Sequence, residues 1–324
     1  MTTKAQVKLD SYRKKPRDLS DELMTALEAG GDLAPVLAAV KRSSELRLDI
    51  RDRRFNVYYS GGSLLLVDGR KSPPTMMFDK KYFKGRTAPD LPDQLRTVTD
   101  SLSWVAAFPE LMEGMREWWG IHPNVERAHC QAIANANSAS DGLPSADYLV
   151  LDLEYQWAQR RFDMVAARRR PTEADKLGWA EPQLALVEVK SKPEACFGKS
   201  GIASHVRDYQ DIVAARGRSA VQEIKCEYQT VIRQKRRLGL LHESLPFDHF
   251  SADVPELLIV LDDLDPLAPP RARLADELTD VSKGFTGAGA LSIIRLSAGT
   301  SPPPRDWQLK EAEKVPLGEF LRPR

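Results

Sequence analysis

The chain has 324 residues, of which 42% are hydrophobic and 29% are charged, and its formal net charge is +1. This is ordinary globular composition, with enough apolar material for one large domain or two of modest size. The near-zero net charge excludes a protein that attracts polyanions through a global field, so any such binding must come from local clusters.

The cysteines exclude two further classes of protein. Cys130, Cys196 and Cys226 are odd in number and far apart, which fits neither a disulfide framework nor a zinc pattern. No apolar run is long enough to span a bilayer, and the first residues lack the apolar segment of a signal peptide. We therefore expect a soluble, cytoplasmic protein with no membrane partner.

The N-terminal part of the chain predicts a small α+β unit over residues 1–90. Helical periodicity comes first, and Gly61-Gly62 between two apolar runs then predicts a hairpin turn. The expected helices cover 19–29 and 33–40, and the expected strands cover 46–51, 55–59 and 63–67. Prolines at positions 89 and 92 mark the expected boundary.

Residues 91–324 predict an α/β domain, a mixed β-sheet flanked by helices. A long helix over 94–119 comes first, and its pattern ends at a glycine. The next expected elements are a helix, three strands, two helices, a strand, a helix and a strand. They cover 125–136, 148–157, 160–167, 183–190, 202–215, 221–240, 257–261, 271–281 and 291–296.

The most informative stretch is an apolar strand that ends in Glu188 and Lys190. Side chains alternate along a strand, so these two point to the same face. Asp163 lies in the preceding apolar strand, where a charge is costly unless it is compensated. Two acids and a lysine on adjacent strands could hold a divalent metal and a water beside a phosphodiester. The alternative for Asp163 is an ion pair with Arg160 or Arg161.

Asp163 followed by Glu188-Val189-Lys190 resembles the PD-(D/E)xK nuclease superfamily, whose fold is restriction-endonuclease-like. Other segments resemble an uncharacterised bacterial subgroup of that superfamily. They are Glu126-Arg127 with Gln131, Asp147-Tyr148, Asp152 to Tyr155, Arg161 to Asp163, and Gly198 to Gly201 with His205 and Tyr209. The chain departs from the pattern in its long connection over 167–182 and in lacking a proline before Asp163.

The resemblance implies a nuclease that hydrolyses phosphodiester bonds of nucleic acid, with DNA expected, and that uses Mg²⁺ or Mn²⁺. Asp163 and Glu188 would bind the metal with waters and the Val189 carbonyl. Lys190 would orient or deprotonate the attacking water and meet the charge of the phosphate. The neighbouring acids would hold its pKa, so a simple lysine base is not assured.

Other acids could complete the site. The resemblance implies that Glu126 is the helical acid of the site, and Glu154 or Asp152, on one strand face, could be a further metal ligand. The alternative for Glu126 and Glu154 is that they are surface or salt-bridged acids, because carboxylates are mostly exposed.

Basic residues near the expected site predict contacts to phosphates. The run Arg168, Arg169 and Arg170 follows the Asp163 strand, Lys199 lies in a loop before a helix, and His205 follows on that helix. A packing role for His205 is an equal alternative. The basic residues of the N-terminal hairpin are interleaved with aromatic residues and could bind nucleic acid. The favoured interpretation is the charged outer face of an ordinary strand core.

Two competing interpretations use other features. The acids of the stretch 262–265 end a strand and could serve phosphoryl transfer, although a polar strand end explains them better. A nuclease fold could also be retained without cleavage, in a nucleic-acid-binding or assembly protein. For the nuclease, a double-strand cut would need two active sites and hence a homodimer. The biological role could be restriction, repair or phage defence, and phage defence is the role that we expect.

Overall fold

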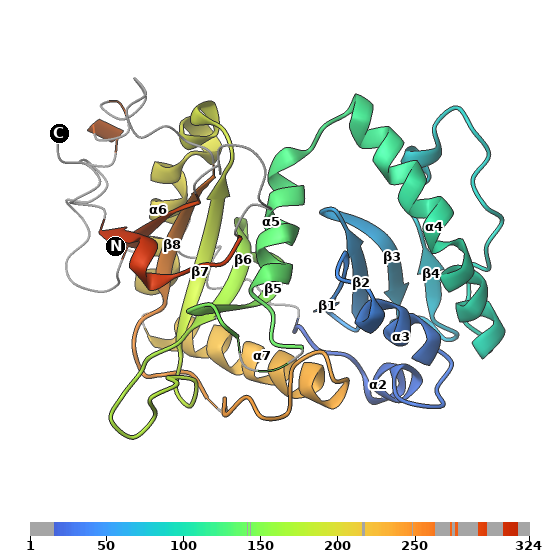
Figure 1. The fold of residues 1–324 in the computed structure, drawn as a ribbon, viewed down its shortest axis with the longest axis horizontal. Helices are drawn as coiled ribbons and strands as arrows, with labels where there is room; N and C mark the ends of the chain where they lie inside the picture. Colours follow the sequence, from blue (N-terminus) through green and yellow to red (C-terminus); the bar gives the residue numbers. More distant parts are fainter. Residues whose placement is uncertain are drawn as a thin grey trace.

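The structure is a computed structural model. It describes residues 16–140, 142, 144–215, 218–247, 249–262, 273, 276–277, 291–296 and 307–316. Over these residues the protein is a mixed α/β protein with a four-stranded sheet and a six-stranded sheet side by side (Figure 1). The helix expected over 271–281 lies largely outside the described residues.

The smaller sheet is antiparallel, with strand order β1-β2-β3-β4. Its elements are α2 (Asp21–Leu27), α3 (Ala34–Arg42), β1 (Leu46–Arg51), β2 (Arg54–Tyr59), β3 (Gly62–Asp68), β4 (Thr75–Met77) and η1 (Lys80–Phe83). The expected hairpin is confirmed. Ser60 and Gly61 both have positive φ, at 46° and 79°, which is the backbone that a tight turn between twisted strands requires.

The long helix α4 (Val98–Ile121) packs on the smaller sheet, against β3 and α3. It begins at a capping box, in which Thr97 and Asp100 bind each other's backbone N–H groups. Sequence analysis placed residues 91–121 with the second domain. In the structure this helix packs with the first sheet, so the boundary between the two units lies after α4 and not at residue 90.

The larger sheet has strand order β10-β9-β8-β7-β6-β5. It is mixed, as expected, because β5, β6 and β7 form an antiparallel meander while β7, β8 and β9 run parallel. Its elements are α5 (Val125–Ala136), β5 (Tyr148–Trp157), β6 (Arg160–Arg168), β7 (Gln183–Lys190), η2 (Pro193–Cys196), η3 (Gly198–Ser200), α6 (Ile202–Ala215), α7 (Arg218–Arg237), β8 (Glu256–Asp262), β9 (Leu291–Leu296), η4 (Glu311–Glu313) and β10 (Lys314–Pro316).

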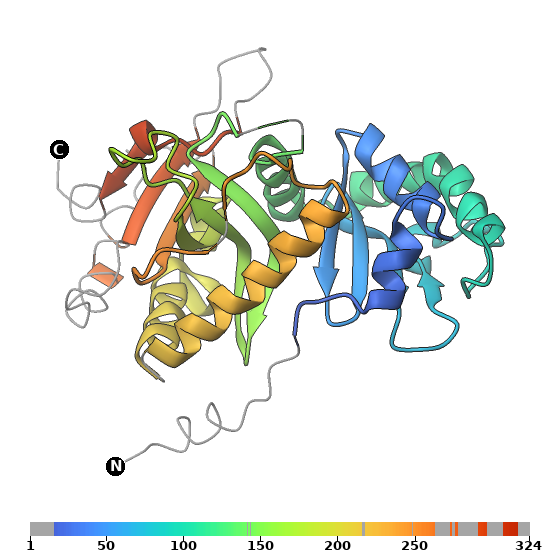
Figure 2. The same ribbon diagram turned by 90° about the horizontal axis from the view of Figure 1, so that it is seen from below.

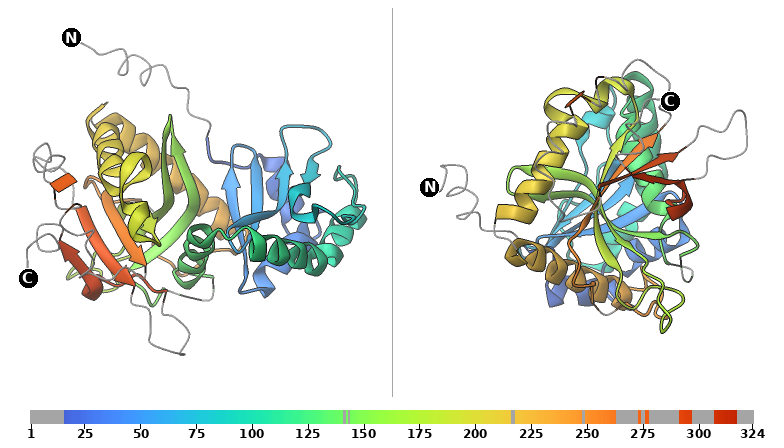
Figure 3. Two further views of the ribbon diagram at one scale, coloured as in Figure 1. Left: turned by 90° about the horizontal axis from the view of Figure 1, so that it is seen from above. Right: turned by 90° about the vertical axis from the view of Figure 1, so that its left-hand side faces the viewer.

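Helices cover both faces of the larger sheet. Helix α5 lies on one face, and α6 and α7 lie on the other (Figure 3). All eight residues of β7 are buried, because side chains from both faces pack into cores. Val187 joins the core under α5, and Leu186 joins the core under α6. Every helix in the described part of the chain is too short or too polar to cross a membrane.

Buried polar contacts join the two units. Helix α7 reaches the first unit (Figure 2), where Lys235 Nζ lies 2.6 Å from Asp49 Oδ1 on β1. Arg47, on the same strand, donates to the carbonyls of Ala134 and Val150, both at 2.9 Å. These groups are buried and charged, so the contact between the units is specific rather than a loose apolar patch.

Candidate active site

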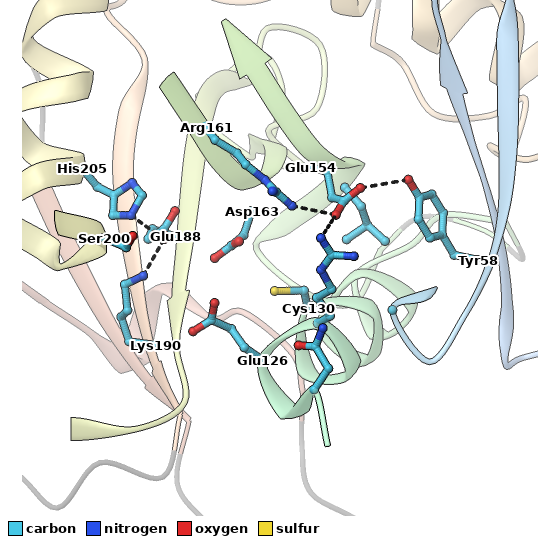
Figure 4. Close-up of a pocket in the computed structure, with 14 residues that line it drawn as sticks. Tyr58, Glu126, Cys130, Glu154, Arg161, Asp163, Glu188, Lys190, Ser200 and His205 are labelled. Carbon is cyan, nitrogen blue, oxygen red and sulfur yellow. Dashed lines mark hydrogen bonds and ion pairs between the residues drawn. The ribbon is translucent and has the colours of Figure 1, made fainter. Parts of the chain in front are cut away.

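A cavity of about 290 Å³ opens where β6 and β7 diverge, next to the start of α5 (Figure 4). Both units contribute to its wall. The lining residues are Tyr58, Gly61, Asn124, Glu126, Arg127, Cys130, Leu153, Glu154, Arg161, Asp163, Glu188, Lys190, Ser200 and His205.

Asp163 and Glu188 come together at the base of this cavity. The last backbone pair between β6 and β7 is Met164 with Val187, so the next residues along the two strands, Asp163 and Glu188, are opposite each other. The strands then separate, and Asp163 Oδ2 accepts a hydrogen bond from the Val189 N–H at 2.9 Å. Two carboxylates of adjacent strands therefore share one pocket, as the sequence predicts.

The Glu188 carboxylate has two basic neighbours. Lys190 Nζ lies 2.6 Å from Glu188 Oε1, and His205 Nε2, from α6, lies 2.8 Å from the same oxygen. The His205 contact is an ion-pair distance without the alignment of a hydrogen bond, and neither ring nitrogen of His205 has a hydrogen-bond partner. Glu188 and Lys190 are each 3% exposed. The site is thus charged, largely desolvated and fixed by its own contacts.

The titration of these groups follows from their surroundings. Burial and the nearby Glu188 carboxylate raise the pKa of Asp163 to about 7. Burial is the largest single effect on the pKa of Lys190 and lowers it, but the carboxylates of Glu188, Asp163 and Glu126 together raise it by more, so Lys190 stays protonated. The pKa of His205 rises for the same reason, because contact with Glu188 outweighs burial. Lys190 is therefore a fixed cation and not a free base.

The donor chemistry fits a hard divalent cation. Two carboxylates that oppose each other's ionisation leave negative charge that a cation would offset, and Mg²⁺ is commonly held by one or two carboxylates with waters. Asp163 and Glu188 would hold such an ion. No set of three metal-ligating His, Cys, Asp or Glu side chains occurs within the ranges that the structure describes. Backbone oxygen or water would have to complete the shell.

Glu126 also faces this site. It lies in the first turn of α5, where an acid is favoured by the helix dipole. Its carboxylate points toward the space between Asp163 and Lys190 (Figure 4), and its charge contributes to the raised pKa of both groups. The structure thus brings the expected helical acid to the two strand acids.

Glu154 lines the same cavity but is engaged elsewhere. Its carboxylate binds Arg161 at 2.7 Å and Arg127 at 3.1 Å, and it accepts a hydrogen bond from the Tyr58 hydroxyl at 3.3 Å. These contacts match the salt-bridged alternative and give no support to a role as metal ligand. Asp152 is buried and binds three groups, Arg17, Arg51 and the Tyr228 hydroxyl.

The three arginines after the Asp163 strand lie away from the cavity. Arg168 pairs with Gln183, the first residue of β7, whereas Lys190 is the last. At about 3.3 Å per residue, the two ends of β7 are roughly 23 Å apart. Arg168 binds Glu256 and Glu311, Arg169 binds Asp147, and Arg170 binds Asp253. The proximity on which their expected phosphate contacts depend is not found.

Two further residues were expected to contact nucleic acid, Lys199 and His205, and they lie at different places in the cavity. Lys199 lies in the exposed turn η3 at the edge of the cavity, but it is not one of the lining residues. His205 is inside the cavity, where it contacts Glu188.

Four lining residues are neither predicted site residues nor part of the segments that carry the resemblance: Tyr58, Gly61, Asn124 and Cys130. Cys130 follows Glu126 by four positions on α5, so helical spacing could have placed it on the same face. Burial raises the pKa of its thiol well above the usual value, so it lines the cavity uncharged. Tyr58 and Gly61 come from the first unit, and no local pattern connects them to β6 and β7. The Gly61 N–H donates to Gln131 Oε1 at 2.6 Å, which ties the hairpin to α5.

Comparison of the chain with models of protein families, with curated proteins and with solved structures finds no match. The functional argument therefore depends on the geometry of this cavity.

Proposed function

We propose that this protein is a divalent-metal-dependent nuclease that hydrolyses phosphodiester bonds, with DNA as the expected substrate. The observation that carries the proposal is the meeting of Asp163, Glu188 and Lys190 in one desolvated cavity, with Glu126 beside them. A structural ion pair would need only one acid for the lysine. Here the second acid is held opposite the first despite the cost to its ionisation.

The arrangement of elements supports a restriction-endonuclease-like fold. The larger unit presents a helix, an antiparallel meander of three strands, helices and then a parallel strand. In the fold that the sequence resembles, the second meander strand carries an Asp and the third carries the (D/E)xK residues. Asp163 on β6 and Glu188 with Lys190 on β7 occupy those strands.

The residues divide the chemistry among them. Asp163 and Glu188 would hold the ion, and a bound Mg²⁺ would lower the pKa of a water and offset charge on the phosphate. Lys190, protonated and held by Glu188, would orient the attacking water and stabilise negative charge that develops on the phosphate. His205 would fix the Glu188 carboxylate from the opposite side.

A cleavage assay on the full chain tests the proposal. Plasmid and labelled oligonucleotides, single-stranded and duplex, are incubated with Mg²⁺, Mn²⁺, Ca²⁺ or chelator. We expect cleavage with Mg²⁺ or Mn²⁺ and suppression by chelator and by Ca²⁺, whose looser geometry suits the reaction poorly.

Two variants separate the site from contamination and from misfolding. Lys190→Ala should abolish cleavage, and Lys192→Ala, an exposed lysine just beyond β7, should cleave like wild type. Circular dichroism and thermal melts check that both fold. Equal cleavage by Lys190→Ala and wild type would show that this cavity is not the active site. Tight binding without cleavage in any cation would favour the catalytically silent alternative.

A further inference from the structure

A second cavity, of about 410 Å³, adjoins the candidate active site. The two cavities share Tyr58, Arg127, Glu154 and Arg161 as lining residues, so they form one continuous depression. One wall of the second cavity comes from β2 of the smaller sheet, and the other comes from β5 and β6 of the larger sheet. The path from the active site therefore runs along the contact between the two units.

Five arginines line this second cavity, which we call the arginine groove. They are Arg17, Arg51, Arg54, Arg127 and Arg161. Four of them share carboxylates in pairs, because Asp152 binds Arg17 and Arg51 while Glu154 binds Arg127 and Arg161. Each group of two arginines and one acid keeps one positive charge. Asp52 and Glu227 also line the groove, so its five arginines outnumber the four acids Asp52, Asp152, Glu154 and Glu227 by one charge.

The fifth arginine, Arg54, is the least satisfied. It lies on β2, and its Nε is buried without a hydrogen-bond partner. This atom is covered by the protein, so Arg54 contributes to the groove through its charge and not through a hydrogen bond from Nε. Arg161, which lines the same groove from β6, has a side chain that is 52% exposed.

We propose that the arginine groove binds the sugar–phosphate backbone of the strand whose scissile phosphate lies in the active-site cavity. Arg127 and Arg161, whose side chains are 47% and 52% exposed and held by Glu154, present N–H donors that match phosphate oxygens. The N–H groups of Arg17 and Arg51 are bound within the protein, so these two arginines contribute charge. This inference rests on the proposed nuclease function. It means that the smaller sheet forms one side of the groove in which the substrate binds. An acidic peptide has the right charge, but it would have no reason to continue into the cavity of Asp163 and Glu188.

Binding without cleavage tests the inference separately from the nuclease activity. The affinity of the full chain for a fluorescent oligonucleotide is measured by anisotropy in chelator, from 50 to 300 mM salt, in single-stranded and duplex form. The groove variants are Arg54→Gln and Arg161→Ala. Arg53→Gln is the neighbouring control, because Arg53 is 58% exposed and does not line the groove. Arg170→Ala tests whether the arginines at the other end of β7, away from the cavity, contribute to binding.

We expect each groove variant to weaken binding about tenfold, because a charge-assisted hydrogen bond is worth roughly the free energy of a tenfold change. Each should also lower the log–log salt slope by about 0.9 on duplex or about 0.7 on single strands. Arg53→Gln and Arg170→Ala should leave the affinity and the slope unchanged. Thermal melts confirm that the groove variants are folded; Arg161, being exposed, is the safer of the two.

Three results would overturn the inference. Groove variants that bind like wild type would remove the groove from the binding surface, and cleavage by those variants at the wild-type rate would leave the nuclease proposal standing. A lower slope for Arg170→Ala alone would move the surface to the far end of β7. Competition by an acidic peptide, but not by unlabelled oligonucleotide, would identify a protein partner. A wild-type chain that neither binds nor cleaves nucleic acid would instead refute the nuclease proposal.

Discussion

Asp163 Oδ2 accepts a hydrogen bond from the backbone N–H of Val189, the residue between Glu188 and Lys190. A side chain of β6 thus replaces a backbone acceptor at the point where the two strands separate. This contact fixes the peptide that carries Glu188 and Lys190. The carboxylate that would bind a metal is therefore also the group that positions the other two members of the site.

The first prediction concerns the stability of the metal-free protein. The pKa of Asp163 is about 7 in the folded chain and near 3.8 in an unfolded chain. Because the unfolded state loses this proton at lower pH, the carboxylate costs stability as pH rises from about 4 to 7, and the cost is constant above that. Asp163→Asn removes the cost and should stabilise the metal-free protein at pH 8 by on the order of 2–4 kcal/mol.

Urea denaturation in chelator at pH 4 to 8 measures this difference. The two proteins should have similar free energies of unfolding near pH 4 and should diverge as pH rises. Mg²⁺ should then raise the melting temperature of wild type at pH 8 and leave that of the variant unchanged. Parallel pH profiles would show that the Asp163 carboxylate is not strained in the absence of a cation.

The second prediction ranks the acids of the site. Glu188→Gln should reduce cleavage to the limit of detection, because it removes a proposed metal ligand and the partner of Lys190. Glu126→Gln should reduce it by about 10–100-fold, the range typical of groups that act through a ligand. Glu154→Gln should have the smallest effect on the chemical step. Single-turnover cleavage rates check this order, and a larger loss for Glu154→Gln than for Glu126→Gln would reverse the roles.

The third prediction separates two roles for His205. Sequence analysis expects a contact to the nucleic acid, whereas the structure places its Nε2 against Glu188. A positioning role predicts that His205→Gln lowers kcat by about 10–100-fold while affinity in chelator stays at the wild-type value. His249→Gln, on an exposed histidine paired with Glu181, is the control. A loss of affinity in chelator without a loss of kcat would support the nucleic-acid contact instead.

The fourth prediction concerns the contact between the two units. Lys235 and Asp49 are both buried, so removing one partner leaves an undercompensated charge. Lys235→Met should cost on the order of 3 kcal/mol of unfolding free energy. The double variant Lys235→Met with Asp49→Asn should cost less than the sum of the single changes. Chemical denaturation measures these values, and strict additivity would mean that the pair does not interact.

Most of the secondary structure of the larger unit is readable from the sequence. The apolar runs of β5, β6 and β7 are confirmed at almost the expected limits, since a strand buried on both faces leaves a continuous apolar signal. The placement of Asp163 opposite Glu188 followed from the same signal, because a meander brings consecutive strands together.

The positions of several residues in the folded chain could not be predicted from the sequence. Arg168 is only five residues from Asp163, yet an extended strand carries it roughly 17 Å away. Glu154 and Asp152 were expected on one face of β5, but Glu154 has a positive φ of 55°, which interrupts the alternation of side chains along the strand. The packing of α4 on the smaller sheet likewise depends on contacts that no local pattern encodes.

The shared contact between the sheets limits how the chain can be shortened. Several walls and ion pairs of the larger unit are supplied by the first 60 residues, among them Tyr58 over the cavity and Asp49 against Lys235. A fragment that begins after residue 90 would keep Asp163, Glu188 and Lys190, but Lys235 and Asp152 would lose their oppositely charged partners Asp49, Arg17 and Arg51. The larger sheet therefore depends on the smaller one, and a transfer of the proposed active site to another protein would require both sheets together.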